Sequence, residues 1–386
     1  MAPERVVIIG AGRAGLATAR AYRDAGGQGS VTLIGAEQHL PYQRPPLTKE
    51  FLRGELARSE LDLEQASWFA ERSVELCVDA CAETIDAVNG EVRLADGRSV
   101  PADACVLATG SRPARLPVPG ADHEDVLEIR KLDDSERLIE RARSAATAVV
   151  IGSGFIGCEA AASLAMSGLE VTLVSVEPVP QADRLGVEAG RRIAAWLREV
   201  GVTLILGAEV EEIVDARRVR IAGAPCLTAD VVVLATGVVP NGELAAAIGL
   251  ELHDGAVPVD ASMRSENPFL SAVGDVAWAL HRGAGRRLRV EHWGDALAHG
   301  EIAGRALAGE DAEWDQVPGF WSTIGSRTLK YAAWGDTFDE ARLVDHGSGA
   351  FTVWYARSGV AVGVLTHERD EDYERGRELI ARGERL

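Results

Sequence analysis

The chain repeats one local plan twice, and this duplication constrains its fold more than any other feature. In each copy, a short β-branched run leads into a glycine-rich loop, an alanine-rich helical pattern and a second apolar run. A later apolar run closes each copy on Ala-Thr-Gly; the first copy spans residues 6–110 and the second residues 148–237. Helical patterns that alternate with buried strand patterns are typical of α/β proteins with parallel sheets. The sequence therefore predicts an α/β fold with two related domains.

Both glycine loops have the spacing Gly-x-Gly-x-x-Gly between a predicted strand and a predicted helix. They are Gly10-Ala11-Gly12-Arg13-Ala14-Gly15 and Gly152-Ser153-Gly154-Phe155-Ile156-Gly157. In such a loop the first glycine permits the tight turn, the second lets a pyrophosphate approach the backbone, and the third lets the helix pack on the strand. The pattern alone is weak, because glycine turns are common. Its strand and helix context in both copies favours two Rossmann-like dinucleotide sites, with the phosphates facing the helix N-termini.

An acidic residue about 20 positions past each loop is expected to bind a ribose hydroxyl. Glu37 has this place in the first copy. In the second copy Ser175 follows the strand directly, and the nearest acid is Glu177. The missing carboxylate removes one penalty against a 2′-phosphate, but no arginine follows to bind one. We therefore expect Glu177 to serve the second site and NADH to be favoured, with NADPH left open.

Composition narrows the classes of partner. The 386 residues carry 40 basic and 59 acidic side chains, so the net charge of −19 argues against nucleic acid or an anionic membrane surface as the main partner. No long uncharged apolar run appears, and residues 1–10 lack the pattern of a signal peptide, so we expect a cytoplasmic protein. The eight histidines show no clustered ligand spacing, and we expect no metal site.

The cysteines point to reduced thiols. Five in 386 residues cannot form a dense disulfide framework. Cys77 and Cys81 are separated by three residues instead of the two of a redox Cys-x-x-Cys, which favours two incidental thiols over a redox pair. Cys158 lies inside the second glycine loop region, where we expect it to pack a helix start and not to react.

Several further segments resemble one family closely. These are His39-Leu40-Pro41-Tyr42-Gln43-Arg44-Pro45-Pro46-Leu47-Thr48-Lys49, Ala108-Thr109-Gly110-Ser111-Arg112-Pro113, Arg130, the run 152–159, Ala235-Thr236-Gly237-Val238-Val239-Pro240-Asn241, Val273-Gly274-Asp275 and Glu291-His292-Trp293. Together they are similar to the NAD(P)H-dependent, FAD-containing ferredoxin reductases of oxygenase and cytochrome P450 systems, which include putidaredoxin and rubredoxin reductases. The resemblance covers residues from about 5 to 305.

The resemblance implies a glutathione reductase-like FAD/NAD(P) fold in which the first loop binds FAD and the second binds NAD(P)H. The residues it implies as cofactor-binding are Gly10, Gly12, Ala14, Gly15, Glu37, Arg44, Lys49, Ala82, Thr109, Gly110, Arg130, Gly152, Gly154, Phe155, Ile156, Gly157, Glu159, Glu177, Gly237, Asp275 and Trp293. Arg44 and Lys49 would contact the flavin side, and Asp275 the ribityl chain or pyrophosphate. Trp293 would line the site of the isoalloxazine ring, although a tryptophan more often packs in the hydrophobic core.

The resemblance also implies a catalytic pair. In similar reductases the lysine lies near flavin N5 and pairs with a glutamate, here Lys49 and Glu159. Two plainer alternatives stay open: a role for Lys49 as a solvated cation, and a role for Glu159 in stabilising the positive start of a helix. Trp321 matches an aromatic beside the active site, but Thr323-Ile324 stands where Asp-Gln is typical, which puts the acceptor side in doubt. Residues 38–60 contain no cysteine, unlike the thiol-using enzymes on this fold.

The pattern predicts an interrupted domain order. We expect an FAD domain over residues 1–115 and 241–312, an NAD(P)H domain over 116–240, and a C-terminal α+β domain over 313–386. In the last domain the β-rich runs 329–334, 350–356 and 360–365 predict an antiparallel sheet. The stretch 370–382 predicts a closing helix.

The function implied is hydride transfer from NAD(P)H to FAD, followed by single-electron transfer to a ferredoxin. The chain has no cysteine spacing for its own iron–sulfur cluster, so the ferredoxin must be a separate chain, with monomer and homodimer both open. Arg286, Arg287 and Arg289 could dock an acidic ferredoxin, or could form a solvated loop. Two alternatives remain: a flavin oxidoreductase acting directly on a small-molecule acceptor, and an FAD-binding redox sensor.

Overall fold

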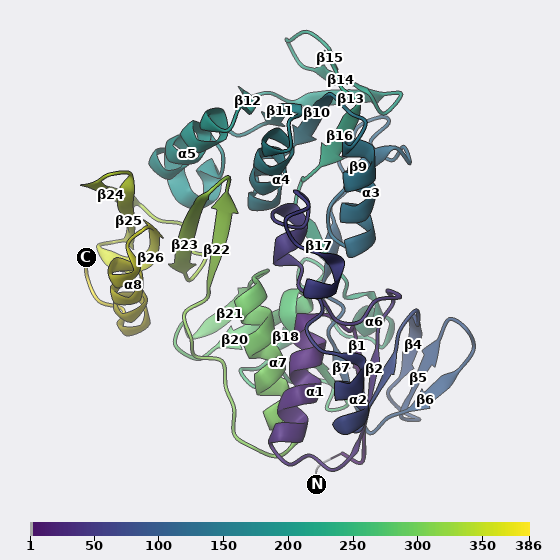
Figure 1. Cartoon of the computed structure of the whole chain (residues 1–386). Coiled ribbons are helices and arrows are strands. Elements are labelled where there is room, and N and C mark those ends of the chain that lie inside the picture. Colours follow the sequence, from purple (N-terminus) through teal and green to yellow (C-terminus); the bar gives the residue numbers. More distant parts are fainter. Residues whose placement is uncertain (1–2) are drawn as a thin grey trace. The chain divides into compact units, whose positions relative to one another are not determined.

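The computed structural model describes residues 3–386, and its chain divides into two compact units (Figure 1). Unit 1 contains the residues up to Gln43, Asp62–Arg112 and Val239–Phe320. Unit 2 contains Arg44–Leu61, Pro113–Val238 and Trp321–Leu386. Two short strands, β8 (Ser111–Pro113) and β17 (Val238–Pro240), lie where the chain passes from one unit to the next. Within residues 3–386 no helix is both long and apolar enough to cross a membrane.

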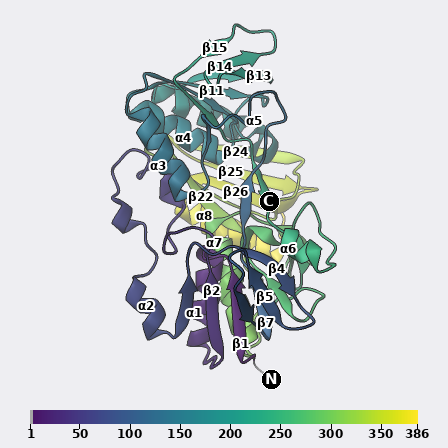
Figure 2. The same cartoon turned by 90° about the vertical axis from the view of Figure 1, so that its right-hand side faces the viewer.

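Unit 1 is built on a five-stranded parallel sheet with the order β19-β7-β1-β2-β3. Figure 2 shows β7, β1 and β2 near the centre of this sheet. The strands are β1 (Arg5–Ile9), β2 (Ser30–Ile34), β3 (Val74–Cys77), β7 (Ala104–Leu107) and β19 (Leu270–Ala272). β7 is buried along its whole length, as are four of the five residues in β1 and β2, because parallel strands covered on both faces need apolar side chains throughout. The first predicted copy of the repeat is confirmed.

Two long helices of unit 1 pack tightly against each other through small residues. They are α1 (Arg13–Asp24) and α7 (Trp293–Leu307), and Figure 1 shows them side by side. A Cβ added to Gly300 would lie 2.3 Å from the Ala14 carbonyl oxygen, and one added to Gly304 would lie 2.4 Å from that of Thr18. Glycine is therefore required at both positions for this close approach of two backbones.

Smaller elements complete unit 1. A three-stranded antiparallel sheet contains β4 (Ala82–Asp86), β5 (Glu91–Leu94) and β6 (Ser99–Pro101). Another sheet contains β18 (Val257–Val259), β20 (Ala277–His281) and β21 (Arg286–Arg289). The short helices of unit 1 are α2 (Ala66–Glu71), α6 (Glu243–Ala247) and η3 (Gly274–Val276), whereas η2 (Arg58–Glu60) belongs to unit 2.

Unit 2 repeats the parallel architecture with the order β12-β11-β10-β16-β9. The strands are β9 (Val126–Glu128), β10 (Thr147–Ile151), β11 (Glu170–Ser175), β12 (Thr203–Leu206) and β16 (Val231–Leu234). The helices are η1 (Pro45–Thr48), α3 (Leu132–Ala142), α4 (Phe155–Met166) and α5 (Ala182–Glu199). A small antiparallel sheet of β13 (Val210–Val214), β14 (Arg218–Ile221) and β15 (Leu227–Thr228) packs its buried side chains with those of β10 and β16.

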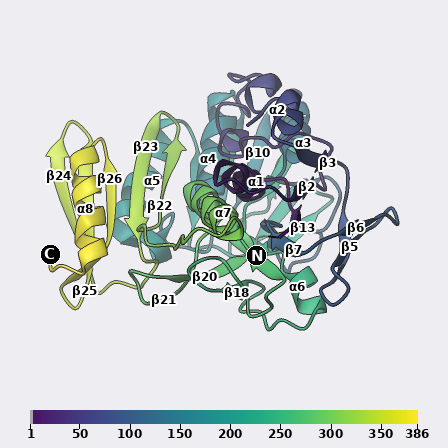
Figure 3. The ribbon, with the colours of Figure 1, turned by 90° about the horizontal axis from the view of Figure 1, so that it is seen from below.

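The C-terminal part of unit 2 is an antiparallel sheet with the order β22-β23-β26-β25-β24. Its strands are β22 (Gly319–Ile324), β23 (Arg327–Ala333), β24 (Glu340–Gly347), β25 (Ala350–Arg357) and β26 (Val360–His367). The chain closes with α8 (Asp370–Arg382), which lies against this sheet (Figure 3). A Cβ on Gly376 of α8 would lie 2.4 Å from the Val364 side chain. The three predicted strands and the predicted closing helix are confirmed, as is the predicted fold class.

Candidate functional site

The first glycine loop connects β1 to α1, and two of its glycines are required by the protein's own packing. Gly10 has φ of 115°, and a Cβ there would lie 2.1 Å from the Ala108 carbonyl oxygen. A Cβ on Gly15 would lie 1.9 Å from the Gly10 carbonyl oxygen. These contacts explain the first and third glycines as turn and packing residues, as the fingerprint predicts.

Gly12 differs, because nothing within the described chain requires a glycine there. Its φ is −83°, which any residue adopts, and a Cβ would meet no described atom within 4 Å. Gly12 is also the N-cap of α1, where no described side chain caps the helix and no acid occupies the first turn. The start of α1 therefore has no side-chain cap and has open space beside Gly12, which suits the phosphates of a dinucleotide.

Three predicted residues of unit 1 are fixed by hydrogen bonds to partners outside the predicted set. Tyr42 donates from its hydroxyl to Oε2 of Glu37 at 2.6 Å, and Ser111 donates to Oδ2 of the buried Asp275 at 2.6 Å. The Thr109 hydroxyl donates to the main-chain oxygen of Asn241 at 2.7 Å, and the Asn241 amide donates back to the Thr109 oxygen at 2.9 Å. Tyr42, Ser111 and Asn241 belong to segments that carried the resemblance, which was the available signal for them.

Trp293 begins α7 and is half-buried, and the guanidinium carbon of Arg13 lies 5.4 Å from its ring centroid. The desolvation of Arg13 by burial lowers the pKa of this guanidinium from its ordinary value. The structure therefore joins Trp293 to the first glycine loop. Ala82 begins β4, just beyond a segment in which the Asp79 N–H donates to the Glu37 carbonyl oxygen at 3.0 Å.

The second glycine loop has the geometry of the first. Gly152 has φ of 110°, and its Cβ would lie 2.3 Å from the Ala235 carbonyl oxygen; a Cβ on Gly157 would lie 2.1 Å from the Gly152 oxygen. At Gly154 a Cβ would have only ordinary van der Waals contacts, at 3.9 Å, so the protein's own packing does not require a glycine there. Phe155 and Ile156 form the first residues of α4, whose N-terminus has no side-chain cap within the described chain. Gly237, with φ of 101°, follows β16, and a Cβ there would meet no described atom within 4 Å.

Glu177 lies beside the second loop and is held by several donors. Its Oε2 accepts the Ser153 hydroxyl at 2.9 Å and the Gln181 N–H at 3.2 Å, and its Oε1 accepts the Asp183 N–H at 3.1 Å. The Ser153 and Ser175 hydroxyls are 2.7 Å apart. Position 175 has no carboxylate, but the Glu177 carboxylate lies two residues further on and is hydrogen-bonded to the loop through Ser153.

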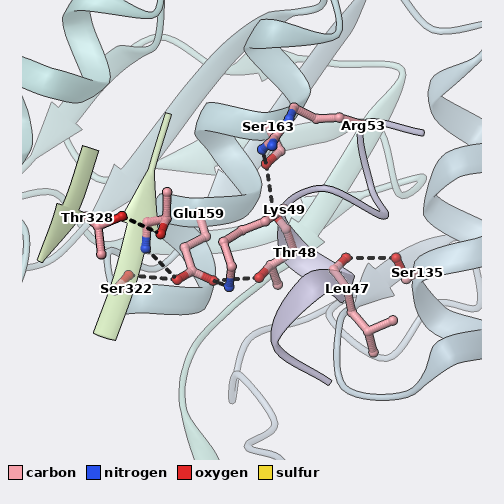
Figure 4. Close-up of polar contacts among 10 residues, drawn as sticks. Leu47, Thr48, Lys49, Arg53, Ser135, Glu159, Ser163, Ser322 and Thr328 are labelled. Carbon is pink, nitrogen blue, oxygen red and sulfur yellow. Dashed lines mark hydrogen bonds and ion pairs between the residues drawn. The ribbon is translucent and has the colours of Figure 1, made fainter. Parts of the chain in front are cut away.

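Lys49 and Glu159 form a buried ion pair in unit 2, with 3.0 Å between Nζ and Oε2 and with each residue 6% exposed (Figure 4). The segment that carries Lys49 is held by two serine hydroxyls. Ser135 of α3 donates to the Leu47 carbonyl oxygen at 2.8 Å, and Ser163 of α4 donates to that of Thr48 at 2.7 Å. The sequence predicted this pair, and its burial rules out the alternative that Lys49 is a solvated cation.

Glu159 accepts four hydrogen bonds, two at each carboxylate oxygen (Figure 4). Thr48 donates from its hydroxyl to Oε2 at 2.5 Å, beside Lys49. The Ser322 hydroxyl donates to Oε1 at 2.7 Å, and the main-chain N–H of Thr323 lies 3.3 Å from the same atom. Glu159 is the fifth residue of α4, beyond its first turn, so the alternative role of stabilising the helix start does not account for it.

Sequence reasoning missed Ser322 and Thr48 as partners of Glu159. Thr48 adjoins Lys49 in the chain, which was a usable signal. Ser322 stands next to Trp321, which is 47% exposed. The resemblance linked Trp321 to the active site, but it indicated no contact between Ser322 and Glu159. Arg44 and Arg130 lie together in unit 2, where Arg44 Nη1 donates to the Arg130 carbonyl oxygen at 2.5 Å. Unit 2 thus contains Arg44, Lys49 and Arg130, whereas Gly12, Glu37 and Asp275 belong to unit 1.

The cysteine thiols are not among the contacts of Lys49 and Glu159. Cys158 is 0% exposed, its Sγ lies 3.3 Å from the Ser153 carbonyl oxygen, and burial raises the pKa of its thiol well above the ordinary value. Cys77 ends β3, Cys81 precedes β4, and both are free. The described residues therefore provide two helix starts that suit phosphates and one buried ammonium–carboxylate pair. Because none of these groups carries electrons, a redox reaction at this site needs a bound electron carrier.

Comparison with known proteins gives one consistent result. The family described as pyridine nucleotide-disulphide oxidoreductase matches residues 4–300. Rhodocoxin reductase of Rhodococcus erythropolis is 34% identical over 97% of this chain and 89% of its own length. The ferredoxin–NAD(+) reductase subunit of the benzene 1,2-dioxygenase system of Pseudomonas putida is 32% identical over 97% of this chain and 92% of its own. The structure is also similar to a chain in the covalent putidaredoxin reductase–putidaredoxin complex, with a TM-score of 0.92, 28% identity, and coverage of 98% of this chain and 93% of that one.

Proposed function

Because this chain belongs to the pyridine nucleotide-disulphide oxidoreductase family, we propose that it is an FAD-dependent NAD(P)H:ferredoxin reductase. It takes hydride from NADH or NADPH and passes electrons singly to a separate iron–sulfur protein. The observation that carries this proposal is the buried ion pair of Lys49 with Glu159. The segment that contains Lys49, residues 38–60, lacks the cysteine that thiol-using enzymes of this fold need. When bound, FAD supplies the exchange between two-electron and one-electron chemistry.

The cradle around Gly12 fits the FAD pyrophosphate. The uncapped N–H groups of α1 would donate to its phosphates, and the absence of a Cβ leaves room for them. Glu37, oriented by Tyr42, would accept from a ribose hydroxyl, and Asp275, oriented by Ser111, would accept from the ribityl chain. Trp293, with the Arg13 guanidinium over its ring, would line the flavin site.

The cradle around Gly154 fits the coenzyme pyrophosphate in the same way. Glu177, held beside the second loop by Ser153, would accept from a ribose hydroxyl, and its negative charge would repel a 2′-phosphate. We therefore propose NADH as the preferred coenzyme. Lys49 would present its ammonium to the flavin side, with Glu159 fixing the direction of that charge in a site of low dielectric.

The partner is proposed to be an acidic ferredoxin that meets the arginines of β21. Arg286, Arg287 and Arg289 are exposed while Leu288 between them is buried. Arg287 is already engaged with unit 1, because it donates to the Val259 carbonyl oxygen at 3.2 Å and lies over the Trp278 ring. On a chain of net charge −19 this strand is a local basic surface.

The three-domain division and the cytoplasmic location remain predictions.

The proposal is tested by an anaerobic titration of the purified flavoprotein with NADH and, separately, with NADPH. Bleaching of the visible flavin band by either coenzyme would support the reductive half of the reaction. Subsequent reduction of a [2Fe–2S] ferredoxin, at a rate that falls as salt is raised, would support the acceptor half. A protein that neither coenzyme bleaches would refute the reductase, and reduction of quinones but of no ferredoxin would favour a small-molecule acceptor.

A further inference from the structure

The two oxygens of the Glu159 carboxylate are held by chain segments that are far apart in sequence. Oε2 accepts from Thr48 and Lys49, on the segment 44–61. Oε1 accepts from Ser322 and from the Thr323 N–H, both on β22 (Figure 4). Because Lys49 contacts only Oε2 of this carboxylate, the direction of the ion pair depends on what holds the other oxygen.

Ser322 is the side chain that holds it. Its hydroxyl lies 2.7 Å from Oε1, a short distance typical of a hydroxyl that donates to an ionised carboxylate, and the residue is 1% exposed. Side chains alternate along a strand, so β22 turns Ser322 inward while its neighbour Trp321 is 47% exposed. The hydroxyl therefore has a buried position with one charged acceptor.

The hairpin of β22 and β23 also contains a pair of hydroxyls that does not involve Glu159. The Thr323 and Thr328 hydroxyls are 2.9 Å apart and join the two strands. This pair uses the side chain of Thr323, whereas Glu159 meets only its main-chain N–H. The chain thus contains two neighbouring hydroxyls on one strand, of which only Ser322 touches the carboxylate.

We propose that Ser322 is a positioning residue for the reductive half-reaction, acting through Glu159 on the charge of Lys49. The inference rests on the proposed function of this site. Without the Ser322 hydroxyl, the carboxylate keeps its two bonds at Oε2 but loses its strongest tie at Oε1, and it can rotate about its terminal torsion. The ammonium of Lys49 then samples several directions, and the preorganised electrostatic contribution to hydride transfer falls.

The test compares Ser322→Ala with Thr328→Val by anaerobic stopped-flow reduction of the bound flavin. Thr328→Val removes the hydroxyl pair with Thr323 and leaves the four donors to Glu159 unchanged, so it controls for damage to the hairpin. For Ser322→Ala we expect the limiting rate at saturating NADH to fall about 10-fold, equivalent to ~1.4 kcal/mol, with the Kd for NADH within about twofold of wild type. For Thr328→Val we expect both constants to stay within about twofold.

A limiting rate of Ser322→Ala within twofold of wild type would overturn the inference, and so would an equal loss in both variants. A rise in Kd with an unchanged limiting rate would also overturn it, because that pattern assigns Ser322 to coenzyme binding. These outcomes are distinct from failure of the proposed function, in which the wild-type flavin itself is not reduced by NADH or NADPH. That result would refute the reductase and the role of Ser322 together.

Discussion

The Ser153 hydroxyl lies 2.9 Å from Oε2 of Glu177 and ties the second glycine loop to the segment after β11. Ser153 is 2% exposed, and its hydroxyl also lies 2.7 Å from that of Ser175. The negative charge therefore does not move freely on a surface loop but is fixed beside the residue that ends the strand. This arrangement holds the Glu177 carboxylate beside the second glycine loop even though position 175 is a serine.

Replacing Glu177 with Gln should weaken the preference for NADH over NADPH. The substitution removes the charge that repels a 2′-phosphate and keeps a polar group of the same size. We expect the ratio of kcat/KM for NADH to that for NADPH to fall about 10-fold. Asp183→Asn is a matched control, because only the main chain of Asp183 contacts Glu177. An unchanged ratio in Glu177→Gln, or an equal change in the control, would contradict this assignment.

Gly12→Ala and Gly15→Ala should separate ligand binding from folding. A Cβ at Gly12 meets no described atom, whereas one at Gly15 would lie 1.9 Å from the Gly10 oxygen. We expect Gly12→Ala to keep the free energy of unfolding of the apoprotein within about 1 kcal/mol and to bind FAD at least about 10-fold more weakly. Gly15→Ala should instead destabilise the apoprotein itself, by more than about 2 kcal/mol. Urea unfolding and fluorescence titration with FAD measure both quantities, and full FAD affinity in Gly12→Ala would refute the cradle.

The repeat and its plan of strand, glycine loop and helix could be predicted because each copy encodes its own local pattern. Gly10, Gly12 and Gly15 lie within six residues, and the strands on either side are continuous apolar runs. The ligands of Glu159 could not be predicted in this way, because Ser322 is 163 residues away and carries no pattern of its own. Only tertiary packing brings β22 to α4. The resemblance supplied Lys49 and Glu159, but it gave no geometry for Thr48 or for the bond between Ser153 and Glu177.

Removing one partner of the Lys49–Glu159 pair should cost unequal amounts of stability. Glu159→Leu leaves a buried ammonium without its carboxylate, and we expect a loss of about 3 kcal/mol in the free energy of unfolding. Lys49→Met leaves a carboxylate that still accepts from Thr48, Ser322 and Thr323, so its loss should be smaller by about 1 kcal/mol or more. The double variant should lose less than the sum of the two. Urea unfolding at equal FAD concentration checks this order, and additive losses would contradict a coupled pair.

The five cysteines should divide by burial in their reaction with a thiol reagent. Cys81 and Cys226 are exposed, whereas Cys105 and Cys158 are buried, and burial raises the pKa of both buried thiols far above the ordinary value. Burial also raises the pKa of the half-buried Cys77. We expect rapid labelling of Cys81 and Cys226, slower labelling of Cys77, and none of the buried pair until the protein unfolds. Peptide mapping after brief labelling measures the extent of modification of each cysteine. Early modification of Cys158 would contradict this prediction and indicate a reactive thiol.

His299 should make unit 1 less stable as the pH falls. This residue of α7 is 0% exposed, its ring lies 4.4 Å from that of Trp314, and neither ring nitrogen has a hydrogen-bond partner within residues 3–386. Burial lowers the pKa of His299 to about 4. The unfolded chain, with a histidine pKa of about 6.5, therefore binds more protons between these two values, and the free energy of unfolding falls as the pH drops through this window. The loss in the free energy of unfolding that His299 causes is close to zero at pH 7 and reaches about 2 kcal/mol at pH 5.

The variant His299→Leu removes the titrating group and fills the space with an apolar side chain. We expect its stability relative to wild type to rise by about 2 kcal/mol when the pH is lowered from 7 to 5. His123→Leu changes an exposed histidine, whose side chain is 44% accessible, and serves as the control with no expected pH-dependent gain. Urea unfolding of the three proteins at both pH values, at one FAD concentration, supplies the comparison. If His299→Leu and wild type lose stability in parallel, the acid sensitivity belongs to other groups and His299 is not buried in its neutral form.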